Sequence, residues 1–86
     1  MERTLTQNKI SDFYTWQKSE EKSENTVEKY IRDVTAFMMY LGGDVITKET
    51  VIAYKSKLID ENYAVRSINS MLASLNSLFA FLGWVI

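Results

Sequence analysis

The sequence predicts a single all-α domain, a compact four-helix bundle. Its 86 residues suit one small domain with one hydrophobic core. Hydrophobic residues make up 47% of the chain, which favours a packed core over disorder. There is no proline and there are only three glycines, so a turn-rich sheet fold is disfavoured. Apolar residues also recur at helical spacing along four segments.

The first two predicted helices span residues 5–22 and 25–41. In the first, the inward residues are Ile10, Phe13, Tyr14 and, as an open alternative, Trp16. In the second, Asn25 and Glu28 have the spacing of a capping box. Gly42 and Gly43 end this helix, because glycine readily adopts the left-handed conformation past a helix C-terminus. One face of the second helix is apolar and carries Val27, Tyr30, Ile31, Val34, Phe37, Met38 and Leu41.

The third and fourth predicted helices span residues 48–60 and 66–82, with a turn at 61–64 between them. Thr47 caps the third helix, and Gly83 ends the fourth. The inner side of the third helix is Val51, Ile52, Tyr54, the stem of Lys55, and Leu58 or Ile59. The fourth helix has a continuous apolar stripe of Ile68, Met71, Leu72, Leu75, Leu78, Phe79 and Leu82.

The polar face of the fourth helix carries almost no charge. Arg66 stands at its start, followed by Asn69, Ser70, Ala73, Ser74, Asn76, Ser77 and Ala80. Solvated helices are usually covered with Glu and Lys, which are better helix formers than Ser and Asn. Short, uncharged, hydrogen-bonding side chains suit close approach to another surface, such as a DNA groove. The alternative is that this face packs against another protein segment.

The second helix presents a narrow basic strip opposite its apolar face. The strip consists of Lys22, Asn25, Lys29, Arg32 and Ala36, and the acids Glu24, Glu28 and Asp33 lie off it. Such a strip can neutralise DNA phosphates, although the net charge of −1 gives no general indication of nucleic-acid binding. The alternative is that Lys29 and Arg32 are solvated and pair with Asp33 or Glu28.

Several other classes of protein are disfavoured. The chain has no cysteine, so it has neither a disulfide framework nor a thiolate metal site. Its first 22 residues lack a signal-peptide core, and no apolar run approaches the roughly 18 residues that a membrane span needs. There is no phosphate loop, metal box or paired-carboxylate site. We therefore expect no metal, no cofactor and no membrane partner.

Three segments resemble one known family in order and spacing. Residues 23–37, which read SENTVEKYIRDV and then Phe37, resemble the opening of the N-terminal, SAM-like core-binding domain of tyrosine recombinases and phage integrases. Residues 46–58 are similar to the third helix of that domain, with ITKETV followed by Tyr54 and Leu58. Residues 67–84 are similar to its fourth helix. The resemblance covers nearly the whole chain.

The resemblance implies that the domain forms one jaw of a clamp around DNA, with its second and fourth helices facing the duplex. The DNA-contacting residues expected by position are Thr26, Lys29, Arg32, Arg66, Ser67, Asn69, Ser70, Ala73, Ser74 and Ser77. Lys29 and Arg32 suit phosphates, and Asn69 suits the edge of adenine. The implied partners are double-stranded DNA at a recombination site, the catalytic domain of the same parent chain, and other recombinase protomers.

We expect the chain itself to be non-catalytic. The family cleaves DNA with a tyrosine nucleophile, assisted by Arg, Lys and His residues of a separate C-terminal domain. This chain has no histidine, and Arg3, Arg32 and Arg66 lie on different segments. Residues 1–86 are thus expected to be one core-binding domain, a fragment of a cytoplasmic, bacterial or phage-encoded recombinase. The competing function is a protein-interaction module that docks through its Ser/Asn face, and it should show little salt dependence.

Overall fold

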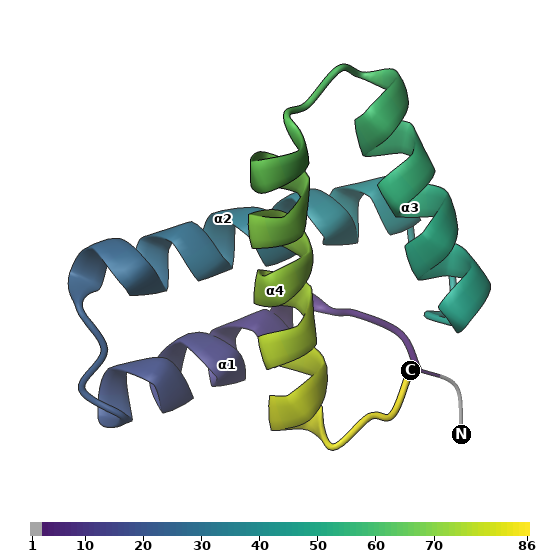
Figure 1. Ribbon diagram of the computed structural model, residues 1–86. Coiled ribbons are helices and arrows are strands. Elements are labelled where there is room, and N and C mark those ends of the chain that lie inside the picture. The colour runs from purple at the N-terminus through teal and green to yellow at the C-terminus, as the bar shows by residue number, and fades with distance from the viewer. Residues whose placement is uncertain (1–2) are drawn as a thin grey trace.

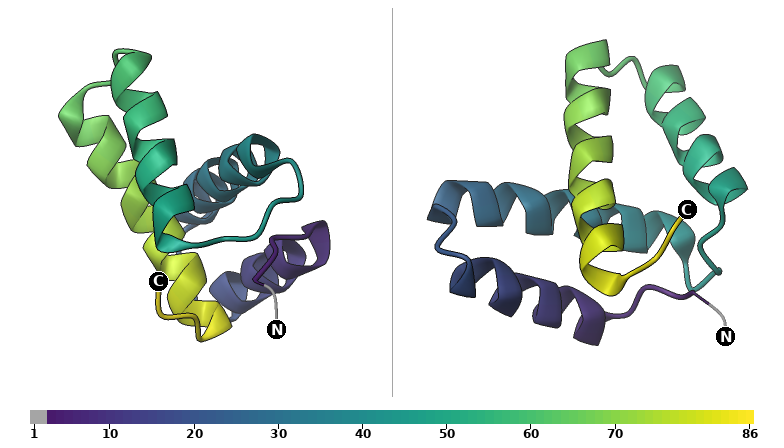
Figure 2. Two further views of the ribbon diagram at one scale, coloured as in Figure 1. Left: turned by 90° about the vertical axis from the view of Figure 1, so that its right-hand side faces the viewer. Right: turned by 60° about the horizontal axis from the view of Figure 1, so that its bottom comes forward.

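The computed structural model describes residues 3–86, which form four helices and confirm the prediction of an all-α, four-helix domain (Figure 1). They are α1 (Gln7–Ser19), α2 (Glu24–Leu41), α3 (Lys48–Asp60) and α4 (Val65–Leu82). Helices α1 and α2 run antiparallel, and α4 crosses over them. Helix α3 returns beside the first half of α4, and Figure 2 shows the same arrangement from two other sides. Helix α4 packs against both α2 and α3, so it is the central element of the domain.

The two ends of the described chain lie close together. Thr4 forms an isolated antiparallel bridge with Val45, in the segment between α2 and α3. The amide of Ile46 donates to the carbonyl of Arg3, at 2.6 Å. The Arg3 guanidinium in turn donates to the carbonyl of Val85, at 2.7 Å. The segment before α1 therefore ties the α2–α3 connection to the segment after α4.

Side-chain caps fix the start of three helices. The hydroxyls of Thr6, Ser23 and Thr47 each accept from the amide three residues further on. The prediction of Thr47 is confirmed, whereas Asn25 is not the cap of α2, because Ser23 already satisfies the amide of Thr26. Likewise, α1 begins at residue 7 and not at 5, because Thr6 is extended and caps it. Helix α4 follows Ala64, which offers no side-chain cap.

Three helices end in the same hydrogen-bonded motif. After α1, α3 and α4, the amide of one residue donates to the carbonyl five positions back, and the preceding amide donates to the carbonyl three positions back. This is the Schellman motif, whose penultimate residue is left-handed. That residue is Glu21 (φ 58°) after α1, Asn62 (φ 64°) after α3 and Gly83 (φ 73°) after α4. Helix α2 ends at Gly42, also left-handed, as predicted.

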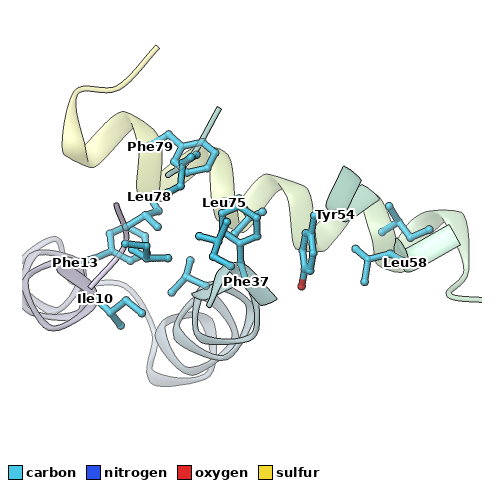
Figure 3. Close-up of a cluster of buried hydrophobic side chains, with 13 residues drawn as sticks. Ile10, Phe13, Phe37, Tyr54, Leu58, Leu75, Leu78 and Phe79 are labelled. Atoms are coloured by element: carbon cyan, nitrogen blue, oxygen red, sulfur yellow. The ribbon is translucent and has the colours of Figure 1, made fainter. Parts of the chain in front are cut away.

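The core runs beneath α4. Figure 3 shows its labelled side chains in a row, from Ile10 and Phe13 of α1 past Phe37 of α2 to Tyr54 and Leu58 of α3. The apolar stripes predicted for α2 and α4 are confirmed, because their residues are buried or packed against this cluster. Each helix thus contributes its apolar face to one shared core.

Some predictions about the core are wrong. Tyr14, Ile52 and Lys55 are exposed, whereas of the two alternatives Leu58 and Ile59 the structure buries Leu58. The open alternative Trp16 is 36% exposed, and its ring lies 5.2 Å from that of Phe81. In α1, the inward place is taken by Gln17, which is fully buried and has no hydrogen-bond partner for its side-chain amide. Two further polar side chains are buried where α2 meets α4, and these are Asp33 and Ser74.

Candidate nucleic-acid interface

A groove of about 500 Å³ lies between α2 and α4. Five of the ten expected DNA-contacting residues line it, and they are Lys29, Arg32, Arg66, Ser67 and Ser70. The remaining lining residues are Asp33, Ala36, Tyr63 and Met71. We call this feature the α2–α4 groove. It combines the basic strip of the second helix with the first turns of the fourth.

The α2–α4 groove is positively charged although the protein is not. Three basic side chains, Lys29, Arg32 and Arg66, line it against the single carboxylate of Asp33. Its lining therefore has a formal charge of +2, whereas the whole chain has −1. A small net-acidic protein can hold an anion at such a place, because surface potential depends on the local distribution of charge.

A buried hydrogen-bond network ties the two helices together at the floor of this groove. The Lys29 ammonium lies 2.6 Å from Oδ2 of Asp33, 3.0 Å from Oγ of Ser74 and 3.2 Å from the carbonyl oxygen of Ser70. The Ser74 hydroxyl donates to the same Asp33 oxygen, at 2.7 Å. We call this the Lys29–Asp33–Ser74 network. It joins residues 41 to 45 positions apart and so fixes how α4 crosses α2.

Lys29 has little capacity left for a phosphate. An ammonium group has three donors, and three acceptors surround that of Lys29. Pairing with Asp33 is the alternative that the sequence left open for Lys29, and the structure shows it. Arg32 is different, because 74% of its side chain is exposed and its one ion contact within residues 3–86 is a loose 3.9 Å approach to Asp33.

Ser74 is removed from the expected contact surface. Its side chain is fully buried, and its hydroxyl belongs to the network. The sequence predicts that Ser74 lies on the polar face of the fourth helix. Its hydrogen-bond partner is Asp33 of α2 and not DNA or solvent. Such a contact between distant segments leaves no periodic signal in the sequence.

The other expected residues lie outside the groove. Asn69 and Ala73 are exposed along α4, and Ser77 is partly exposed further along the same helix. Thr26 is partly exposed at the start of α2, where its hydroxyl accepts from Ser23 at 2.8 Å. These residues extend the face shared by α2 and α4 to either side of the groove.

Sequence reasoning missed two residues of the groove. Asp33 was placed off the basic strip, yet it lies beneath it, 7% exposed as a side chain. Tyr63 falls in the turn predicted at 61–64, and it is half-exposed at the wall of the groove. The available signal for Tyr63 was local, because the Schellman motif around Asn62 places the following residue against the helix that it terminates.

Neither a metal site nor a membrane-spanning helix is found in the described part of the chain. Between residues 3 and 86, no three His, Cys, Asp or Glu side chains gather closely enough to hold a metal ion. None of the four helices described is long and apolar enough to cross a membrane. The α2–α4 groove is therefore the strongest candidate site in this part of the chain.

Comparison with known proteins agrees with this geometry. Residues 5–84 match the family described as phage integrase, N-terminal SAM-like domain. The chain belongs to this family. It is a core-binding, DNA-binding domain of the integrase type, and the match includes no catalytic domain.

The chain is also similar to a curated recombinase. It is 30% identical over 82 residues to the tyrosine recombinase XerA of Pyrococcus furiosus. The match covers 95% of this chain but only 28% of that relative, so the chain spans little more than a quarter of its length. No solved structure matches the chain significantly.

Proposed function

We propose that this chain binds double-stranded DNA at a recombination site through the face that α2 and α4 share. The observation that carries the proposal is the +2 charge of the α2–α4 groove in a chain of net charge −1. Family membership supports it, because core-binding domains of integrases bind DNA. The parent recombinase would supply the catalytic domain, and other protomers would complete the assembly on DNA.

Within this face, the residues divide by chemistry. Arg32 and Arg66 suit phosphate oxygens, which position a protein on DNA without reading its sequence. Asn69 is exposed on α4 and has the donor and acceptor needed for adenine. Ser70 and Ser77 carry hydroxyls suited to base edges or phosphates. Lys29 and Ser74 act indirectly, by holding α4 against α2.

An added carboxylate tests the proposed face. Ala73 is exposed on α4 and has no side-chain role in the fold, so Ala73→Glu should leave the domain folded. It would place a negative charge against the phosphates and should weaken DNA binding about tenfold or more at low salt. Fluorescence anisotropy with a labelled 20-base-pair duplex measures this. The matched control is Ala53→Glu on the exposed side of α3, which should bind like the original chain.

Salt dependence separates DNA binding from the protein-docking alternative. Amide chemical shifts of residues 25–32 and 66–77 should move on adding the duplex, and should move less as salt is raised. Equal effects of Ala73→Glu and Ala53→Glu would contradict the proposed face. Salt-insensitive binding of a protein segment at Asn69 and Ala73, with no DNA response, would favour the docking function.

A further inference from the structure

We propose that Arg32 and Arg66 both bind the same DNA backbone phosphate at the α2–α4 groove. This inference rests on the proposed function, and it specifies that the two arginines together neutralise a single phosphate. It starts from the fact that the two arginines come from facing helices and line one groove of about 500 Å³. A phosphodiester group is far smaller than this volume.

The Lys29–Asp33–Ser74 network joins the parts of α2 and α4 that carry the two arginines. Arg32 is adjacent to Asp33 in α2, and Arg66 is one helical turn before Ser70 in α4. Lys29 donates to the Ser70 carbonyl at 3.2 Å, so each arginine lies about one helical turn from a residue that joins α2 to α4. Arginine side chains are long enough to converge from two helices packed this closely.

Because the same network occupies Lys29, the arginines are the basic side chains of the groove with donors available for a phosphate. Asp33 is neutralised by Lys29, and the three donors of Lys29 are already directed at protein acceptors. Between residues 3 and 86, Arg66 makes no ion pair, and Arg32 approaches a carboxylate only at 3.9 Å. Two guanidinium forks therefore have donors available for one phosphate, a group that arginine can bind through two parallel hydrogen bonds.

The salt dependence of binding counts the phosphates. The logarithm of the affinity falls linearly with the logarithm of the salt concentration, with a slope of about −0.9 for each phosphate neutralised. If one phosphate is shared, Arg32→Gln and Arg66→Gln should each weaken binding severalfold but leave this slope nearly unchanged, because one cation remains. The double variant should reduce the slope by about 0.9.

The experiment is fluorescence anisotropy of the 86-residue chain with a labelled 20-base-pair duplex at several salt concentrations. The control is Lys55→Gln on the exposed side of α3, which removes one charge outside the groove and should leave the slope unchanged. Circular dichroism and urea unfolding of each variant establish that it is folded.

Each result has a defined meaning. A slope reduced by about 0.9 in each single variant and by about 1.8 in the double variant would mean two separate phosphates and would overturn the inference alone. An unchanged slope in the double variant would overturn it as well, because the arginines would then touch no phosphate. If the original chain shows no salt-dependent DNA binding, the proposed function fails together with this inference.

Discussion

At the scale of single residues, the ion pair of Lys29 and Asp33 contributes to stability because the Asp33 carboxylate is buried. Lys57 and Glu61 have the same spacing and nearly the same separation, 2.8 Å against 2.6 Å. Asp33 is only 7% exposed as a side chain, whereas Lys57 and Glu61 are both nearly half-exposed. Removing the cation from a buried carboxylate costs far more than breaking an exposed pair, because water cannot replace the lost partner.

This contrast makes a stability prediction. Lys29→Met should lower the free energy of unfolding by about 2 kcal/mol, because Asp33 is left charged and buried with the hydroxyl of Ser74 and the loose 3.9 Å approach of Arg32. Adding Asp33→Asn to Lys29→Met should recover part of this loss, since it removes the unpaired charge. Urea unfolding followed by circular dichroism measures both.

Lys57→Met is the matched control at the exposed pair. It should unfold close to the original chain, because its carboxylate partner remains hydrated. If Lys29→Met and Lys57→Met prove equally harmless, the network does not hold α4 against α2. If Asp33→Asn lowers the stability of Lys29→Met further, burial of the carboxylate is not what makes Lys29 necessary.

At the scale of the helix, the conformation of Glu21 offers a gain in stability. Glu21 is left-handed (φ 58°) in the Schellman motif that ends α1, a position that favours glycine. An L-residue in the left-handed conformation costs roughly 1–2 kcal/mol, and glycine avoids this cost. Part of the gain is offset, because glycine makes the unfolded chain more flexible and so loses more entropy on folding. Glu21→Gly should therefore raise the free energy of unfolding by about 0.5 kcal/mol.

Glu20→Gly is the control for this helix end. Glu20 has φ −86°, which any residue adopts, so glycine there brings only the entropic cost and should destabilise the domain. Thermal and urea unfolding of the two variants, with the same charge removed at adjacent positions, isolate the backbone effect. A loss of stability in Glu21→Gly as large as in Glu20→Gly would show that the left-handed conformation is not strained.

The helices themselves could be predicted from the sequence because their signals are local. The Thr47 cap, the Gly42 and Gly83 stops and the period of the apolar residues each act within a few positions. The errors at Asn25 and at the start of α1 arose where two capping residues compete within three positions. Exposed Ile52 could not be distinguished from an inner residue, because only the crossing of α3 and α4 decides which side of α3 is covered.

The candidate site was predicted less completely, because its floor is a tertiary contact. The sequence showed that Arg32 and Arg66 lie on polar faces, and both line the groove. It could not show that Asp33 and Ser74, 41 positions apart, turn toward each other and hold the ammonium group of Lys29. Helix periodicity gives the face of each residue, whereas pairing between faces depends on how the helices cross.

At the scale of the whole molecule, α2, α3 and α4 meet around Tyr54. The residue is only 3% exposed, and the centroid of its ring lies 4.9 Å from those of both Phe37 and Tyr40. Burial raises the pKa of Tyr54 above its ordinary value of 10.0, and the negative charge of Asp33 raises it further. A phenolate cannot form there without weakening the contacts that join three helices.

Alkaline pH should therefore lower the stability of the domain. Above pH about 10, the tyrosine of the unfolded chain has lost its proton while Tyr54 in the folded chain still holds it, so stability falls as pH rises. Tyr54→Phe has no proton to lose, and its unfolding free energy should fall less steeply between pH 9 and about 11. Urea unfolding at each pH measures this.

Tyr14→Phe, at a half-exposed ring, is the control and should retain the steep fall. If Tyr54→Phe and Tyr14→Phe lose stability in parallel, burial of the Tyr54 hydroxyl is not the cause of the alkaline loss of stability.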